Sequence, residues 1–229
     1  MRKLGFIGGL SWYSTRTYYE YINKGVQARA GQHTSAPMLI ESLDFAQLIR
    51  LSDKAGWDRA SEILADSARR LETAGATAII IGANSMHKVY DHVSVAVSVP
   101  MLHIAECVGQ RMAGDGVKKA ALLGTHNVMV DSFYRQRLVS HDIELLAPEM
   151  PVVELLDKII YEELVFGKAS RQAERELKTI ITNAERDGAE AVVLGCTELE
   201  MIVDVDANIL PIYDCTRIHS DAAVDWIMG

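Results

Sequence analysis

Two segments of the chain repeat each other: GATAIIIGANSMH at 75–87 and GAEAVVLGCTELE at 188–200 align without gaps at an offset of 113 residues. Each consists of a short β-branched apolar run that ends in glycine and is followed by small polar residues. Each also follows an amphipathic helical pattern. A self-similarity of this length indicates one supersecondary unit built twice, which predicts two lobes of similar α/β construction.

The repeat extends outward from these two segments. KLGFIGG at 3–9 resembles KAALLGT at 119–125, and the strand that begins at Pro100 is repeated at Pro211. We expect strands at 3–9, 37–42, 77–82, 100–104, 119–124, 142–146, 190–195 and 209–213, and helices at 57–74, 87–97, 128–140, 151–166 and 170–187. Because strands and helices alternate, the expected fold class is α/β: two doubly wound domains, related by pseudo-twofold symmetry, with parallel strands and helices on both faces.

Composition limits the partners of the chain. Its 229 residues are 49% hydrophobic, which is enough to bury a core in one large domain or two smaller ones. The net charge is −8 and no stretch concentrates Lys or Arg, so the electrostatic footprint of a nucleic-acid binder or a polybasic membrane binder is missing. We therefore expect a small-molecule partner, with no nucleic acid and no membrane.

The N-terminal segment and the cysteines indicate the compartment. The first apolar run reaches only Leu10 and is broken by glycines, so it predicts a strand and not a signal peptide. No segment has the length of a membrane span. The three cysteines, Cys107, Cys196 and Cys215, form no CxxC pattern and are too sparse for a disulfide framework. A reducing cytoplasm fits this pattern best.

Cys196 is the candidate acid/base group, because ligands of α/β sheets gather at the carboxyl ends of the strands. It directly follows the strand of the second repeat and precedes TELE, a helix start at which Thr197 can cap. The backbone N–H groups there predict a thiol pKa lowered from about 8.5 towards neutrality. The alternative is a small core residue, which is the commoner fate of a free cysteine.

Four motifs carry a resemblance over essentially the whole chain. KLGFIGGLSWYST, GANSMHKV, LLGT and LGCTEL, in this order and spacing, resemble the aspartate/glutamate racemase family of cofactor-independent amino-acid racemases. The resemblance implies a homodimer and two α/β domains, 1–98 plus 211–229 and 99–210, with the active site in the cleft between them. It also implies that two residues, usually two cysteines or a threonine and a cysteine, exchange protons with opposite faces of the substrate α-carbon.

Ala83 occupies the position at which the family carries the first of these two residues. Inversion by proton transfer needs an acid and a base on opposite faces, and a methyl group is neither. Another group or a water serves that face, or the reaction uses one base, or the chain binds an amino acid without turnover. An alanine introduced to trap a ligand is a further alternative. His87 is the nearest titratable residue in sequence, although a surface or capping histidine is the commoner role.

The developing charge on the substrate carboxylate requires preorganised donors. By resemblance, the carboxylate-binding positions are Asn84, Ser85, Thr125 and Thr197, and Leu10 and Ser11 line the cleft. Arg50 is the candidate for a side-chain carboxylate, with a solvated helix face as its alternative, and Lys168 is a weaker second. Aspartate, glutamate and neutral amino acids all remain open as substrates.

The sequence contains no motif typical of a metal, pyridoxal or nucleotide site. The seven histidines show no HExxH or paired Cys/His spacing, and no lysine carries a Schiff-base motif, so we expect neither a metal nor a pyridoxal cofactor. The glycines of GFIGGLS match neither the Walker nor the dinucleotide spacing. The sequence therefore predicts a cofactor-independent amino-acid racemase with Cys196 as principal acid/base. The alternatives are a one-base lyase that resembles the decarboxylases of the same superfamily, and an amino-acid-binding protein.

Overall fold

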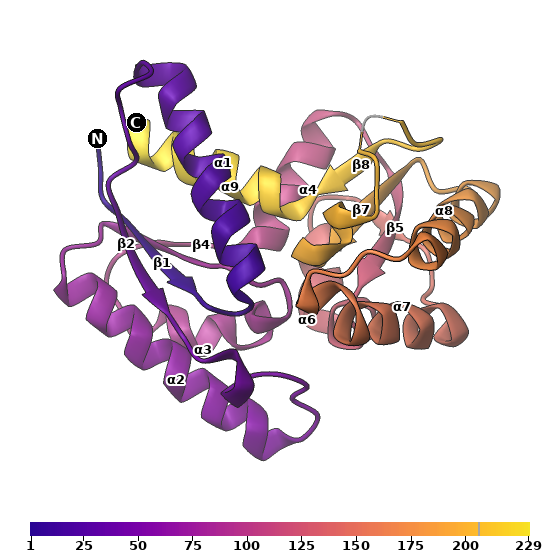
Figure 1. Ribbon diagram of the computed structural model, residues 1–229, viewed down its shortest axis with the longest axis horizontal. Helices are drawn as coiled ribbons and strands as arrows, with labels where there is room; N and C mark the ends of the chain where they lie inside the picture. The colour runs from indigo at the N-terminus through magenta and orange to yellow at the C-terminus, as the bar shows by residue number, and fades with distance from the viewer. Residues whose placement is uncertain (206) are drawn as a thin grey trace. The chain divides into compact units, whose positions relative to one another are not determined.

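The computed structural model describes residues 1–205 and 207–229 and divides into two compact units (Figure 1). Unit 1 comprises Met1–His103 and His219–Gly229, and unit 2 comprises Ile104–Ile218. Each unit contains a four-stranded sheet in which every described pair of neighbouring strands is parallel. The α/β fold class is therefore confirmed.

The sheet of unit 1 has the strand order β2-β1-β3-β4. Its strands are β1 (Leu4–Gly8), β2 (Met38–Ser42), β3 (Ala78–Ile81) and β4 (Met101–Leu102). Its helices and 3-10 turns are α1 (Trp12–Ala30), η1 (Phe45–Gln47), α2 (Lys54–Thr73), η2 (Ser85–Val89), α3 (Tyr90–Ser94) and most of α9 (Cys215–Met228). The order reverses between β1 and β3, which makes this strand pair the switch point of the sheet.

The sheet of unit 2 has the order β6-β5-β7-β8, which is the order of unit 1 with each strand replaced by its repeat. Its strands are β5 (Lys119–Gly124), β6 (Glu144–Leu145), β7 (Ala191–Gly195) and β8 (Ile212–Asp214). Its helices and turns are α4 (Ile104–Gly114), α5 (His126–Val130), α6 (Ser132–Val139), α7 (Met150–Glu162), η3 (Leu164–Phe166), α8 (Arg171–Arg186) and η4 (Thr197–Met201). The internal repeat of the sequence is therefore a repeat of topology, with the second switch point between β5 and β7.

All eight expected strands are present, but three of the expected helices are interrupted. The helix expected at 151–166 is α7, which ends at Glu162, followed after Glu163 by the 3-10 turn η3. The helix expected at 87–97 is a 3-10 turn followed by α3, which ends at Ser94. The β-branched run beyond Ser94 and the constraint imposed by Pro100 on the preceding residue both disfavour a longer helix. The helix expected at 128–140 breaks at Asp131, whose extended backbone lies between α5 and α6.

Helices cover both faces of each sheet. Successive strand residues point to opposite faces, and the residues of both faces are buried against helices. In unit 1, Phe6 and Ile80 pack with residues of α1 and α9, whereas Ile7 and Ile81 pack with residues of α2. In unit 2, neighbouring β7 residues likewise belong to opposite clusters. Full burial of each large aliphatic side chain stabilises the fold by about 1.5–3 kcal/mol, which fixes the strands and the loops that leave them.

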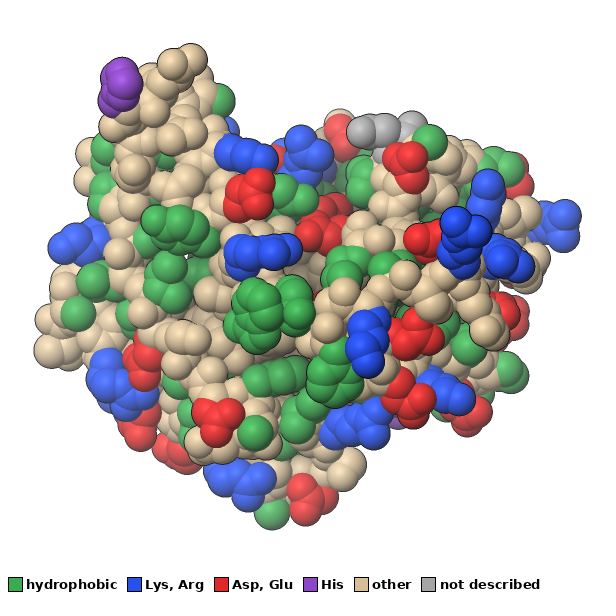
Figure 2. All heavy atoms as spheres, viewed as in Figure 1, with side chains coloured by type: hydrophobic (Ala, Val, Ile, Leu, Met, Phe, Trp, Pro, Cys, Tyr) green, Lys and Arg blue, Asp and Glu red, His purple; other side chains and the backbone are tan. Residues whose placement is uncertain are grey.

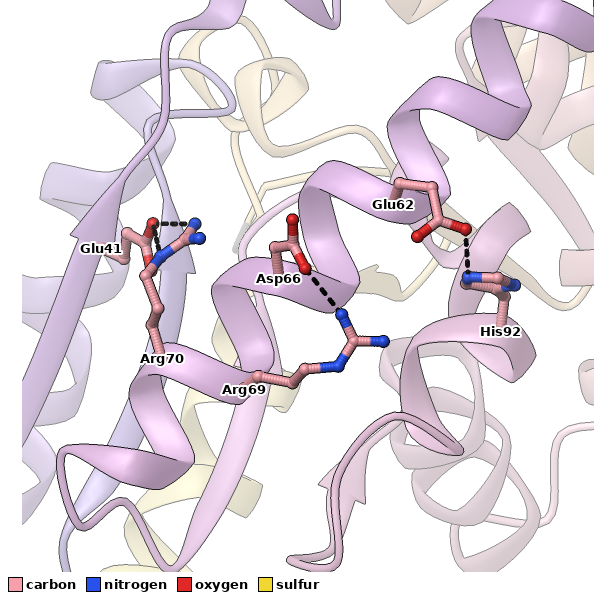
Figure 3. Close-up of polar contacts among 6 residues, drawn as sticks. All are labelled: Glu41, Glu62, Asp66, Arg69, Arg70 and His92. Atoms are coloured by element: carbon pink, nitrogen blue, oxygen red, sulfur yellow. Dashed lines mark hydrogen bonds and ion pairs between the residues drawn. The ribbon is translucent and has the colours of Figure 1, made fainter.

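Helix α2 shows how one pattern gives both a core face and a solvent face. Its buried residues recur at helical spacing: Trp57, Ala60, Leu64, Ala68 and Leu71. Its polar side carries ion pairs (Figure 3): Arg70 pairs with Glu41 of β2, Arg69 with Asp66, and Glu62 with His92 of α3. Exposed pairs of this kind contribute about 0.2–1 kcal/mol each, so packing and not charge holds α2 in place.

The surface carries charges of both signs. On the face drawn in Figure 2, acidic and basic side chains are interspersed and no extended basic patch is visible. Within the described ranges, no helix is both long enough and apolar enough to span a membrane.

Candidate functional site

The predicted site residues follow the switch-point strands. In unit 1, β1 leads into Gly9–Ser11 and β3 leads into Gly82–Asn84, and Gly82 N–H donates to the Ile7 carbonyl (2.9 Å). Gly9 has φ 74°, and a Cβ there would lie 2.2 Å from the Leu43 oxygen, so only glycine fits. The backbone of β1 therefore passes unusually close to the loop after β2.

The second switch point brings Thr125 next to Cys196. Gly124 of β5 pairs with Gly195 of β7, and each predicted site residue is the next one along its strand. A Cβ on Gly124 would lie 2.8 Å from the Gly195 oxygen, and a Cβ on Gly195 would lie 2.7 Å from Cγ1 of Val128, so side chains at both positions are disfavoured. Thr125 and Cys196 are therefore the first residues beyond two paired strand ends of unit 2.

Cys196 is buried and hydrogen-bonded to a carboxylate. Its Sγ donates to Glu198 Oε2 (3.2 Å), and the hydroxyl of Thr197 donates to the same oxygen (2.6 Å). The side chains of all three residues are at most 7% exposed. The result is a compact thiol–carboxylate pair at the carboxyl end of β7, supported by a hydroxyl group.

The environment raises the pKa of Cys196 instead of lowering it. Burial is the largest cause and the negative charge of Glu198 the second, whereas backbone N–H groups of Glu198 and Leu199 act in the opposite direction. The predicted lowering is wrong, because η4 is a five-residue 3-10 helix with little dipole and the thiol is desolvated beside a carboxylate. Cys196 therefore rests as a neutral thiol.

Two further corrections concern the TELE segment. Thr197 does not cap the helix, because Cys196 occupies the N-cap position and no side-chain cap hydrogen bond is present there. Glu198 was not among the predicted site residues, yet its carboxylate is the hydrogen-bond acceptor of Cys196. The one available sequence signal was an acidic residue two positions beyond a strand-end cysteine.

Asn84 is the least satisfied residue of the first switch point. Its side chain is 4% exposed, and neither the oxygen nor the nitrogen of its carboxamide has a hydrogen-bond partner within the described part of the chain. It precedes η2 with helical angles (φ −62°, ψ −49°), so it lacks the extended geometry with which asparagine caps a helix. A buried polar group left unpaired costs about 1–3 kcal/mol, a cost that a bound ligand would remove.

Thr125 has the same property in unit 2. It is 6% exposed, occupies the N-cap position of α5 without a side-chain cap bond, and its hydroxyl has no partner among the described residues. Ser11, by contrast, is used locally: its hydroxyl accepts the Ser14 N–H and caps α1. Leu10 is part of the buried core, and Ser85 is half-buried at the start of η2.

Ala83 is buried, at 7% exposure, and its carbonyl is bound by a histidine. His87 Nδ1 lies 2.9 Å from the Ala83 oxygen, and the His87 side chain is 2% exposed. His87 is therefore neither a surface residue nor a capping residue of the kind that the sequence favoured. Its ring lies inside unit 1, among other aromatic side chains.

The comparisons with known proteins agree over nearly the whole chain. Residues 7–223 match the model of the Asp/Glu/hydantoin racemase family. The chain belongs to this family. A candidate Asp/Glu racemase from Yersinia pestis is 37% identical (TM-score 0.92), and an aspartate racemase homologue from Pyrococcus horikoshii OT3 is 32% identical (TM-score 0.87); each alignment covers 100% of both chains.

A curated relative points to the same class of enzyme. The broad specificity amino-acid racemase RacX of Bacillus subtilis (strain 168) is 26% identical over 170 residues, 73% of this chain and 72% of RacX. The predicted family is therefore confirmed, and with it the assignment of the chain to the racemases, which are isomerases. Within residues 1–205 and 207–229, no group of three His, Cys, Asp or Glu side chains is placed to hold a metal ion.

The two candidate cations lie outside the switch points. Arg50 is exposed in the turn that follows η1, with φ 53°, a left-handed conformation that costs a non-glycine residue about 1–3 kcal/mol. It is not on a helix face, so that alternative is wrong. Lys168 is exposed in the connection between η3 and α8.

Proposed function

We propose that the protein is a cofactor-independent racemase of aspartate, glutamate or a related small amino acid, with Cys196 as its principal acid/base group. The observation that carries the proposal is the hydrogen-bonded pair of Cys196 and Glu198 at the switch point of a racemase-family fold. A buried thiol with an adjacent proton acceptor can exchange a proton with a substrate carbon without any cofactor.

The proton transfers begin with Cys196 and Glu198. On substrate binding, the Cys196 proton passes from Sγ to Glu198 Oε2, which leaves a thiolate. The backbone N–H groups of Glu198 and Leu199, which favour the charged sulfur, stabilise it. The thiolate then removes the substrate α-proton, and the electron pair of the C–H bond moves onto the substrate carboxylate. When the Cys196 thiol returns a proton to the same face, the configuration is retained and the Glu198 proton goes back to Sγ. Inversion needs a water to protonate the opposite face, and the hydroxide that remains takes the proton from Glu198, which restores the starting state.

The unpaired polar groups are the proposed receptors of the carboxylate. Asn84 and Thr125 each carry a buried donor that has no partner among the described residues, and each follows a switch-point strand. Ser85, Thr197 and the cleft-lining Leu10 and Ser11 complete the proposed binding set. Donors that are already desolvated and oriented stabilise the developing charge without reorganisation, which is the main requirement of this reaction.

Ala83 makes the two substrate faces unequal in this proposal. The methyl group exchanges no proton, so the face that it lines is served by water or not at all. Arg50 is the proposed partner of a side-chain carboxylate in a dicarboxylic substrate. We also propose a homodimer and a cytoplasmic location, following the family resemblance.

The experiment incubates pure enantiomers of aspartate, glutamate and several neutral amino acids with the protein in deuterium oxide. NMR measures loss of the α-proton and chiral chromatography measures inversion. Cys196→Ala should abolish both, while Cys107→Ala, a half-buried cysteine on α4, serves as the matched control and should keep both.

Three results would contradict the proposed racemase function. Exchange that persists in Cys196→Ala removes the assigned acid/base group. Binding without exchange by the wild type indicates an amino-acid-binding protein. Turnover of a prochiral malonate to one enantiomer, with no amino-acid inversion, indicates the one-base lyase.

A further inference from the structure

Unit 1 contains a buried cluster of aromatic rings that includes three of the seven histidines. His87, His103 and His219 are at most 6% exposed. The ring of His87 lies 4.7 Å from that of His103 and 5.7 Å from that of His219, centroid to centroid. Tyr18 and Tyr90 complete what we call the histidine cluster. Buried imidazoles are uncommon, and the proposed proton transfer at Cys196 uses none of these.

Hydrogen bonds fix the protonation of His219. Its Nε2 lies 3.1 Å from the Leu102 carbonyl, which can only accept, so Nε2 carries the proton. Its Nδ1 lies 2.9 Å from the Tyr18 hydroxyl and is therefore the acceptor from that group. His219 is thus a neutral ring in the Nε2–H form, held between α1 and β4.

The hydrogen bond of His87 places a proton on its other ring nitrogen, Nδ1. Its Nδ1 lies 2.9 Å from the Ala83 carbonyl, so Nδ1 is the protonated nitrogen and donates to this oxygen. The ring stacks nearly parallel to Tyr90 (11°) and meets His103 edge-on (62°). The imidazole is therefore held in one orientation by its neighbours as well as by its hydrogen bond.

This hydrogen bond also fixes the orientation of the peptide group between Ala83 and Asn84. The Ala83 carbonyl and the Asn84 N–H belong to one planar peptide group, so a ring that fixes the first also fixes the direction of the second. Asn84 has αR backbone angles and no side-chain cap bond. The orientation of its buried carboxamide therefore depends on the peptide plane that precedes it.

We infer that His87 is a positioning residue that aims Asn84 at the substrate carboxylate, with His103, His219 and Tyr18 as its support. The inference rests on the proposed function, because it assigns the ligand of Asn84. It gives the Nδ1 proton of His87 a role in holding a backbone carbonyl and not in proton exchange with the substrate.

The test uses the geometry of side-chain amides. In His87→Asn, the amide nitrogen can occupy the place of Nδ1 and donate to the Ala83 carbonyl; in His87→Gln, it lies where Nε2 was; His87→Leu removes the donor. Loss of one such bond corresponds to about tenfold in a binding constant. We expect KM to rise about tenfold in His87→Gln and His87→Leu and about twofold in His87→Asn, with kcat much less affected in all three.

Two measurements do not depend on turnover. Ring ¹⁵N NMR of the wild type should show His87 as the Nδ1–H tautomer and His219 as the Nε2–H tautomer at neutral pH. Hydrogen exchange at the Asn84 amide should accelerate in His87→Gln and His87→Leu but not in His87→Asn. A wild type that lacks racemase activity but shows these tautomers and this contrast refutes the proposed function and leaves the positioning of Asn84 intact.

Three results overturn the inference. These are a protonated or Nε2–H ring at His87, equal Asn84 amide exchange in the Asn and Gln variants, or a large loss of kcat with unchanged KM in all three variants. The last would make His87 a proton-transfer group. Folding of each variant is checked by the tryptophan fluorescence of unit 1, which contains Trp12, Trp57 and Trp226.

Discussion

The buried ring of His219 makes the stability of unit 1 depend on pH. Burial lowers the pKa of His219 from about 6.5 to about 3, and the nearby His87 adds to the effect. The folded chain therefore holds this ring neutral at a pH at which the unfolded chain binds a proton. Stability is fully present above the unfolded pKa and is lost as the pH falls from about 6.5 towards the folded value.

The size of the loss follows from the two pKa values. Each pH unit between them costs at most about 1.4 kcal/mol, so lowering the pH from about 7.5 to about 5 costs about 2 kcal/mol for this one ring. Most of the loss falls below pH 6.5, where the unfolded imidazole is already protonated. Two kcal/mol is a large fraction of the stability of an ordinary domain.

The assay compares the wild type with His219→Gln. Glutamine keeps an amide donor near the position of Nε2, so the bond to the Leu102 carbonyl can form, but the residue does not titrate. Urea unfolding at both pH values is followed by tryptophan fluorescence, which reports on unit 1 because Trp12, Trp57 and Trp226 all belong to it. The variant should be less stable near pH 7.5 and should lose about 2 kcal/mol less than the wild type at pH 5.

Carboxylates that titrate in the same range contribute equally to both proteins, so the difference between the two pH dependences isolates His219. Equal losses of stability in the wild type and in His219→Gln would refute the argument. A wild type that becomes more stable towards pH 5 would show that the ring is protonated in the folded state.

Four further predictions concern the switch points. Glu198→Gln removes the charge that raises the Cys196 pKa, so iodoacetamide should label Cys196 faster at pH 8, as measured by mass spectrometry, while α-proton exchange slows; slower labelling would contradict the pairing. Ala83→Cys should raise inversion in both directions by about 10²–10⁴-fold, as chiral chromatography would show, and no gain in the folded variant would exclude an acid/base role for that position. Thr125→Val should raise the free energy of unfolding in urea by up to about 1 kcal/mol, because it removes an unpaired buried hydroxyl, and should weaken amino-acid binding. In the wild type, one enantiomer should exchange its α-proton for deuterium faster than it inverts; matched rates for both enantiomers would require a second base.

Most of the fold could be predicted from the sequence, because the repeat and the apolar runs indicate the same strands. The runs after Gly75 and Gly188 are buried on both sides, so their position in a sheet follows from hydrophobicity alone. The break at Asp131 between α5 and α6 could not be predicted in this way. Whether a helical pattern is continued or broken there depends on one residue with an extended backbone, and the polar face of the pattern is unchanged by the break.

The position of the candidate residues at strand ends was predictable, but the electrostatics around them was not. Cys196 and Asn84 follow switch-point strands, and the strand pattern fixes that position. The pKa of Cys196 depends on where the Glu198 carboxylate turns and on how deeply the thiol is buried, which are three-dimensional quantities. The burial of His87 was equally hidden, because the rings that enclose it come from residues more than a hundred positions away as well as from its neighbours.

The two repeats have diverged in chemistry while their topology has stayed the same. After β7, unit 2 carries a thiol whose proton is held by a carboxylate, so this strand end can exchange protons. After β3, the equivalent position in unit 1 carries Ala83, and the titratable residue nearby is turned inward to hold the Ala83 carbonyl. A strand end that has lost its acid/base side chain can still contribute to catalysis by binding, provided that its donors are rigid and desolvated. The carboxamide of Asn84 is desolvated and unpaired, which supports the proposal that the first repeat orients the substrate while Cys196 of the second transfers protons.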